Sequence, residues 1–256
     1  MQNDCYESGS AKMGKRISVG MDRFLDLKWV DYGLDLAILS KESDGYAQLR
    51  DRLALEISGY ESARKTANQI RRLWLVEDNI SWIREIVFQE DLLTHYQYRP
   101  ILHYGMSLII FPLFTQVCQY LGSLFQTSET CTRSQIQHRV LLTYPNSQSS
   151  LRSTDRVLQT LINWGFIQYK DGHYSQIPIK VDDQEIAEWL LIVIVHLMPF
   201  QWCYLRDLHN KPELLGIKIS NLRMIIQRSK YLRIQQDAGN MEIVSYQPVT
   251  EKMAGG

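Results

Sequence analysis

The sequence predicts a mainly α-helical protein, with an N-terminal helical bundle followed by one module of helices and a β-hairpin, and with a second such module left open. Two observations predict this fold class. Apolar residues recur at intervals of three and four through residues 21–125, as one face of an α-helix requires. After residue 127 the pattern changes, because a short helical segment ends at Gly165 and two apolar runs then flank Asp171-Gly172.

The composition is that of a globular protein whose charges balance. The 256 residues are 45% hydrophobic and 22% charged, which excludes a disordered chain. The 28 basic and 28 acidic side chains cancel, so only a local cluster could favour a nucleic-acid partner. Cys5, Cys118, Cys131 and Cys203 are far apart and form no C-x-x-C pair, which indicates free thiols in a reducing cytoplasm.

The changes of pattern divide the chain into five segments. These are a disordered arm (1–16), a helical domain (17–126), the first module (127–181), a helix with the second module (182–247) and a disordered tail (248–256). The arm has no apolar run of the kind found in signal peptides, which favours a cytoplasmic location. In the helical domain, Gly59 predicts a turn between two helices and Gly33 a weak point within one.

An uncharged stretch at residues 101–128 has about the length that a membrane span needs. It contains Pro112, His103 and two glutamines, however, and polar side chains are costly against lipid unless they are hydrogen-bonded. A buried helix of the bundle is therefore expected, with no membrane as a partner. A second apolar run, beginning at Trp189, is too short to span a bilayer.

Residues 127–181 contain the clearest module of the chain. A capped helix is predicted over residues 132–143, with Thr132 or Ser134 as its N-cap. A second helix is predicted to begin after Ser153 and to end at Gly165, which suits a left-handed C-terminal position. Its inward residues at helical spacing are Val157, Leu158, Leu161, Ile162 and Trp164. Because Asp171-Gly172 then predicts a hairpin turn, the order of elements is that of a winged helix-turn-helix.

The pattern Ser-Thr-x-Arg-x-Leu-x-x-Leu-x-x-x-Gly-Phe-Ile, from Ser153, resembles the second helix and first wing strand of winged-helix DNA-binding domains. The resemblance covers residues 132–179. In such domains the start of the second helix enters the major groove and the wing contacts the DNA backbone. The residues that the resemblance places against DNA are Arg152, Ser153, Thr154, Arg156 and Gln159 on the helix, with Lys170 and His173 on the wing. Arg and Gln have donors and acceptors that suit base edges.

An alternative for the same module is protein docking, because winged-helix units also dimerise or bind proteins and any amphipathic helix has a polar face. Asp155 lies within the contact region, and the helix has only two basic residues there, Arg152 and Arg156. A scaffold or adaptor subunit is therefore the competing function. Its candidate contact residues are the aromatic side chains Trp29, Tyr32, Trp82, Tyr96 and Tyr98, since aromatics are enriched at interface centres.

A second basic surface is predicted on the segment "ESARKTANQIRRLW". Its polar residues at helical spacing are Arg64, Lys65, Asn68, Arg71 and Arg72. Such a cluster could bind successive DNA phosphates, with counterion release and a salt-dependent affinity. The alternative is a solvated helix face that Glu61 partly neutralises.

A wider resemblance extends over residues 17–180. The helical first half with "SARKTANQIRRLWLV", the apolar middle helix and "RSTDRVLQTLINWGFI" together are similar to the small BrxA-type proteins of bacterial BREX phage-defence systems. That family is helical, binds double-stranded DNA and belongs to a multi-protein system that discriminates phage DNA. The resemblance implies a DNA-binding complex subunit with antiviral defence as its context. Its partners would be duplex DNA and other proteins of the system, and self-association is left open.

Residues 182–247 are predicted to repeat the design of the first module. An apolar helix runs from Glu185 to about Met198, and a short helix then begins near Ser220. Two β-like runs flank Ala238-Gly239-Asn240. A helix followed by a hairpin thus occurs twice, about 67 positions apart, which favours two related modules.

The sequence has no catalytic motif, which indicates a non-enzymatic protein without a cofactor or metal. Nucleotide-binding loops, zinc-protease helices and nucleophile elbows are all missing. His95 and His103 lie eight residues apart, off the one-turn spacing of a helical metal site, so surface or structural roles are favoured. Asp182 and Asp183 could hold the metal of a nuclease, which is a third hypothesis. At a predicted helix start, capping explains them better.

Overall fold

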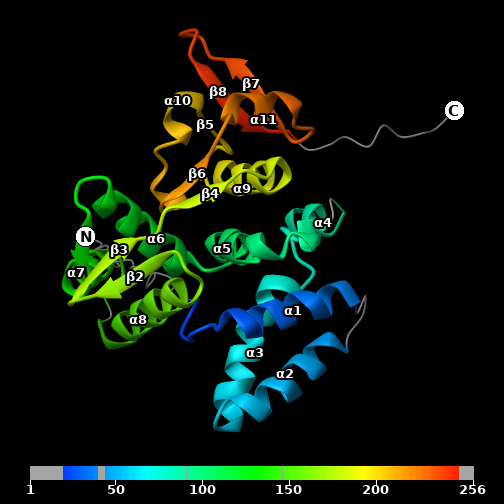
Figure 1. Ribbon diagram of the computed structural model, residues 1–256, viewed down its shortest axis with the longest axis vertical. Helices are drawn as coiled ribbons and strands as arrows, with labels where there is room; N and C mark the ends of the chain where they lie inside the picture. The colour runs from blue at the N-terminus through cyan, green and yellow to red at the C-terminus, as the bar shows by residue number, and fades with distance from the viewer. Residues whose placement is uncertain (1–19, 40–43, 90–91, 146, 248–256) are drawn as a thin grey trace, which may run out of the picture.

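A computed structural model describes residues 20–39, 44–89, 92–145 and 147–247. The predicted arm (1–16), the predicted tail (248–256) and Cys5 lie outside the described residues. The prediction of a mainly helical fold is confirmed, with three small β-sheets in addition. Figure 1 shows the first three helices at one end of the molecule and the last β-hairpin at the other.

The N-terminal bundle is formed by three helices that pack against one another. They are α1 (Leu27–Leu39), α2 (Gly45–Glu56) and α3 (Tyr60–Trp74). Gly59 has a φ of +91° and precedes α3, which confirms the predicted turn. Gly33 serves close packing, because a Cβ there would lie 2.3 Å from Cγ2 of Ile70 on α3. The weak point predicted from the sequence is therefore a contact between helices.

The uncharged stretch forms two helices, so the expectation of one buried helix was wrong. After α4 (Ser81–Gln89) and two short 3₁₀ turns, η1 (Leu92–Thr94) and η2 (Tyr96–Tyr98), come α5 (Arg99–Ile110) and α6 (Pro112–Phe125). Pro112 lacks an N–H and disfavours the helical conformation at Phe111, which is extended with φ −115° and ψ 97°.

The break after α5 also bears on the question of a membrane span. Within the described residues, no single helix is both long and apolar enough to cross a membrane. Tyr96–Ile110 and Pro112–Phe125 reach that length only together, and they are bent by 113° at the break.

The first module follows α6 and has the predicted helices and hairpin. Its elements are β1 (Thr130–Thr132), α7 (Arg133–Thr143), α8 (Ser147–Asn163), β2 (Ile167–Lys170) and β3 (His173–Gln176). Thr132 caps α7 through a reciprocal pair of hydrogen bonds with Gln135. Gly165 ends α8 with a φ of +81°, and Asp171 and Gly172 make the turn with φ of +50° and +83°. The sheet is antiparallel in the order β1-β3-β2.

The last part of the chain repeats this strand order. Strand β4 (Ile179–Val181) closes the first part, and the elements after it are α9 (Gln184–His196), β5 (Trp202–Tyr204), α10 (Leu205–Leu208), η3 (Pro212–Leu214), β6 (Ile217–Ile219), α11 (Leu222–Arg228), β7 (Leu232–Gln236) and β8 (Glu242–Tyr246). The antiparallel sheet has the order β5-β8-β7, so a strand before the helices pairs with the second hairpin strand in both parts. A parallel pair, β4 with β6, joins the two parts.

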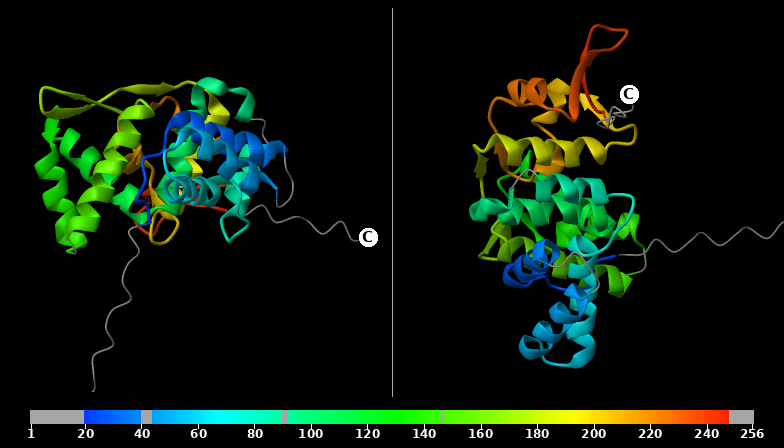
Figure 2. Two further views of the ribbon diagram at one scale, coloured as in Figure 1. Left: turned by 90° about the horizontal axis from the view of Figure 1, so that it is seen from below. Right: turned by 90° about the vertical axis from the view of Figure 1, so that its right-hand side faces the viewer.

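Helix α9 lies between α5 and the last β-hairpin and packs against α5 (Figure 2). Trp189 on α9 is fully buried, and its indole N–H donates to the carbonyl of Ile83 at 3.1 Å. Gly105 on α5 makes room for this ring, because a Cβ there would lie 2.6 Å from it. The buried apolar side chains form one continuous cluster that runs from Met21 to Val244.

Candidate nucleic-acid interface

Helix α8 begins at Ser147, well before the start expected after Ser153, and it buries two of the residues that were predicted to face outward. Ser153 and Thr154 are 2% and 0% exposed, so the prediction that they face outward was wrong. The Thr154 hydroxyl donates to the carbonyl of Ser150, one turn earlier, at 2.8 Å, which satisfies it inside the core. Ile162, predicted to face inward, is 38% exposed.

Three of the predicted residues do form an outer ridge on α8: Arg152, Arg156 and Gln159. All three are exposed, and their spacing of four and three places them on one helix face. A guanidinium N–H of Arg156 donates to the amide oxygen of Gln159 at 2.9 Å. The earlier start adds Gln148 and Ser149, both exposed in the first turn. Sequence reasoning missed these two because a serine-rich run after a proline is also typical of a loop.

The acidic residue beside the ridge is paired across the two helices. Asp155 accepts two hydrogen bonds from the guanidinium of Arg133 at the start of α7, one of them at 2.7 Å from Nε. Gln137 donates a third at 3.1 Å. The hydrogen bond with Asp155 also raises the pKa of Arg133. The negative charge of Asp155, which argued against DNA binding by this helix, is therefore neutralised by Arg133 within the module.

The wing carries the other two predicted contacts at the top of its hairpin. Lys170 and His173 face each other across the β2–β3 ladder, and both are exposed. The Nδ1 of His173 lies 2.9 Å from the carbonyl of Asp171, which favours the tautomer with hydrogen on Nδ1. Tyr169 next to them is 55% exposed and packs against the ring of Tyr174 at 4.7 Å. Lys170, His173 and the ring of Tyr169 thus lie together on the wing.

The predicted basic face of α3 is only partly free. Arg64 pairs with Glu61 at 2.8 Å, and Asn68 accepts a hydrogen bond from the Tyr46 hydroxyl at 2.6 Å. Lys65 is exposed. Arg71 lies over the Tyr46 ring, 5.1 Å from its centroid.

Arg72 is held away from the rest of this face. Its guanidinium donates to the carbonyls of Gly20 and Ile110, each at 3.3 Å, and lies over the Phe111 ring at 5.0 Å. Burial lowers its pKa. Arg72 therefore lies against the junction of α5 and α6, whereas Arg71 lies against α2.

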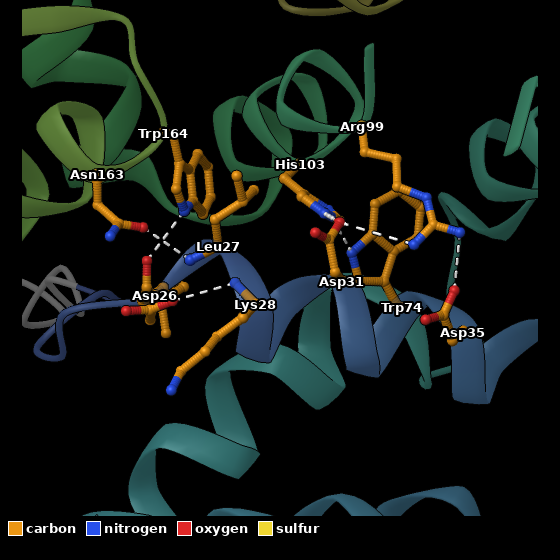
Figure 3. Close-up of polar contacts among 11 residues, drawn as sticks. Asp26, Leu27, Lys28, Asp31, Asp35, Trp74, Arg99, His103, Asn163 and Trp164 are labelled. Carbon is orange, nitrogen blue, oxygen red and sulfur yellow. Dashed lines mark hydrogen bonds and ion pairs between the residues drawn. The ribbon is translucent and has the colours of Figure 1, made fainter. Parts of the chain in front are cut away.

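The segment before α1 ties the end of α8 to the bundle, as Figure 3 shows. The backbone N–H of Leu27 donates to the Asn163 side chain at 2.8 Å, and the indole of Trp164 donates to the carbonyl of Leu25 at 2.9 Å. The N–H of Leu25 donates to the Thr160 hydroxyl at 3.0 Å. The last turn of α8 is thereby fixed relative to α1.

A buried polar network lies beside this junction and joins α1, α3 and α5 (Figure 3). The indole of Trp74 donates to Nδ1 of His103 at 3.1 Å, so the ring hydrogen lies on Nε2 and donates to Asp31 at 2.8 Å. Arg99 pairs with Asp35 at 2.8 Å. Burial lowers the pKa of His103, which keeps the imidazole neutral. The expected structural role of His103 is confirmed.

The carboxylates considered for a metal site are used for capping and ion pairs. Asp183 accepts hydrogen bonds from the N–H groups of Glu185 and Ile186, each at 3.0 Å, and its carboxylate also pairs with His95. The capping interpretation of Asp183 is therefore confirmed. Asp182 pairs with Lys180 at 2.8 Å. Across the described ranges, no three His, Cys, Asp or Glu side chains come together as a metal site would require.

The aromatic side chains expected at a docking surface are mostly packed. Trp29, Tyr32, Trp82 and Tyr98 are only partly exposed, and Trp82 packs against Tyr246 with ring centroids 4.4 Å apart. Tyr96 is 70% exposed.

The chain matches no family model, no curated protein and no solved structure. Its function must therefore be inferred from the geometry of α8, the wing and α3.

Proposed function

We propose that this protein is a non-enzymatic duplex-DNA-binding protein in which α6, β1, α7, α8, β2 and β3 act as a winged helix-turn-helix. The order of helices and strands and the β1-β3-β2 sheet support this assignment. We assign α8 to the major groove and the hairpin to the backbone beside it.

The proposal rests on the ridge of Arg152, Arg156 and Gln159 on α8, beside which Arg133 and Asp155 form an ion pair. Arg and Gln can make paired hydrogen bonds to base edges. Because Arg133 neutralises Asp155, a phosphate approaching this ridge meets a net positive surface although the whole chain is neutral. Lys170 and His173 on the wing, and Lys65 and Arg71 on α3 with the paired Arg64 and Asn68, are assigned to backbone phosphates.

The second module would add another winged-helix unit. It has the same strand order as the first, and α11 exposes Arg223, Gln227 and Arg228. Arg223 is paired with Glu242, as Arg133 is with Asp155. The likeness of the chain to BrxA-type proteins supports a place in a multi-protein anti-phage system, with other proteins of that system as partners.

Fluorescence polarisation with a labelled duplex over a series of salt concentrations tests the proposal. The double variant with Arg152→Gln and Arg156→Gln should bind more weakly, and the slope of log affinity against log salt should fall by about 1 for each phosphate that the variant no longer neutralises. Arg52→Gln, an exposed and ion-paired arginine on α2, is the matched control and should change neither quantity. No binding to any duplex at low salt would reject DNA binding altogether. Unchanged affinity in the double variant would remove the ridge from the interface.

A scaffold that docks other proteins is the second candidate, and the exposed apolar side chains favour it. Leu39, Leu55 and Phe200 are 82%, 82% and 80% exposed, and a protein partner would bury apolar surface that each leaves in water. Purification of a stable complex that survives high salt and retains no DNA would support this function over the first.

A further inference from the structure

A hollow of about 430 Å³ lies where the end of α3, the loop before α4 and the ends of α5 and α9 meet. Its apolar lining is Val76, Ile80, Ile109 and Ile110, and its polar lining is Arg72, Asp78, Asn79 and His196. The volume lies within the range of roughly 300–1,000 Å³ that is typical of small-molecule sites. Neither the ridge of α8 nor the wing contributes a side chain to it.

Arg72 gives the hollow an uncompensated positive charge. Its guanidinium bonds only to the carbonyls of Gly20 and Ile110, and no carboxylate within the described ranges lies within ion-pair distance of it. The negative charge of Asp78, on another wall of the hollow, is neutralised because its carboxylate accepts hydrogen bonds from the buried Arg84 at 2.8 and 3.3 Å. An anion entering the hollow would therefore meet a net positive wall.

His196 also lines the hollow, and it carries an unsatisfied polar atom. Its Nδ1 is buried and has no hydrogen-bond partner in the part of the chain that the structure describes. The ring is held edge-on to Trp82, with centroids 5.6 Å apart. A buried polar atom without a partner costs about 1–3 kcal/mol, so a ligand atom that bonds it would recover that loss.

We propose that this hollow binds a small organic anion. Its carboxylate or phosphate head bonds Arg72 and His196, and its apolar body lies against Ile80, Ile109 and Ile110. The partial exposure of Ile109 and Ile110 supports the second contact, because both side chains leave apolar surface open to the hollow. This site does not depend on DNA binding, and it gives Arg72 a ligand of its own, distinct from the phosphates assigned to Lys65 and Arg71.

Isothermal titration calorimetry of the full chain tests the site with three probes of similar size: phenyl phosphate, benzoate and the neutral benzyl alcohol. We expect at least one of the two anions to bind and benzyl alcohol not to bind. The anion that binds best identifies the head group. Arg72→Gln should weaken this binding at least about tenfold, because it removes a charged hydrogen-bond donor. Arg52→Gln, an exposed and ion-paired arginine on α2 that lies outside both proposed sites, is the matched control and should leave the affinity unchanged.

A second measurement uses the unaltered chain and so does not depend on folding of a variant. The NMR signal of the His196 ring should shift when the bound anion is added and stay in place with benzyl alcohol. Failure of both anions to bind at millimolar concentration would overturn the proposal. So would equal affinity in Arg72→Gln, or a His196 signal that does not move.

Discussion

Replacing His103 by phenylalanine tests how much the buried network of Figure 3 stabilises the fold. The substitution keeps a ring of similar size in a fully buried position but removes two hydrogen bonds. The Trp74 indole loses its acceptor at 3.1 Å, and Asp31, which is 30% exposed, loses a donor at 2.8 Å. An unsatisfied buried N–H costs about 1–3 kcal/mol and the partly solvated carboxylate about 1 more, so His103→Phe should lower the free energy of unfolding by about 2–4 kcal/mol.

The pH dependence of this difference is a sharper test than its size. Burial lowers the pKa of His103 in the folded chain, whereas the unfolded chain keeps a value of about 6.5. Below that pH the unfolded state binds a proton that the folded state does not, so stability falls with the pH until the folded pKa is reached, by at most about 1.4 kcal/mol per pH unit. The His103→Phe variant has no imidazole at this position, so its stability does not fall on acidification for this reason. The stability gap should therefore be widest above pH ~6.5 and shrink on acidification.

Urea unfolding followed by tryptophan fluorescence at a series of pH values measures both quantities. His138→Phe is the matched control, because His138 lies on the exposed side of α7. As a surface substitution, it should change the free energy of unfolding at neutral pH by less than about 0.5 kcal/mol. A gap for His103→Phe that stays constant from about pH 8 to pH 5 would refute the assignment of a neutral, buried imidazole. A gap below about 0.5 kcal/mol at neutral pH would refute the energetic argument.

Three further predictions concern single positions. Asp155→Asn leaves the Arg133 charge unpaired beside the ridge and should strengthen duplex binding and raise the salt slope by up to about 1, measured by polarisation. Gly122→Ala gains about 1 kcal/mol of helix propensity, but its Cβ would lie 2.1 Å from a backbone carbonyl of η3, so a net loss of about 1–2 kcal/mol is expected in urea unfolding. Asp183→Ala removes the N-cap of α9 and should cost about 1 kcal/mol in the same assay, whereas Asp182→Ala should cost less than about 0.5.

The features that the sequence predicted well are caps and turns, in which a residue determines the conformation of the backbone next to it. Thr132 caps the helix that follows it, Gly165 takes the left-handed conformation after α8, and Asp171 and Gly172 take it in the hairpin. Each depends on a few neighbouring residues, so the local pattern was sufficient.

The short strands were not predictable in this way. β1, β4, β5 and β6 have three residues each, too few for an alternating pattern to stand out. Each is a strand because of a distant partner: Thr130 lies opposite Ser175, and Ile179 opposite Ile217. Such pairing depends on tertiary structure, which propensity does not capture.

Two expectations at the candidate site were wrong for one physical reason, since neither took account of backbone carbonyls that accept hydrogen bonds from the polar side chain. Thr154 was expected outside but bonds to a carbonyl of its own helix in the core. Arg72 was placed on the basic face by its position around α3, but carbonyls of Gly20 and Ile110 hold its guanidinium elsewhere. Asp155 was expected to oppose DNA binding, and its partner Arg133 lies 22 residues earlier in the chain.

The orientation of α8 follows from contacts at both ends of the first module, and this bears on how the chain would bind a duplex. The last turn of α8 is fixed to the segment before α1 through Asn163 and Trp164. Beyond the wing, β4 pairs with β6 of the second module. Neither module is therefore joined to the rest by a free linker. The ridge of α8 keeps a fixed relation to a second ridge, formed on α11 by the exposed Arg223, Gln227 and Arg228. A fixed relation lowers the ordering cost of binding, so a duplex that fits both ridges would gain affinity without loop folding. A duplex that fits only one ridge would gain nothing from the other.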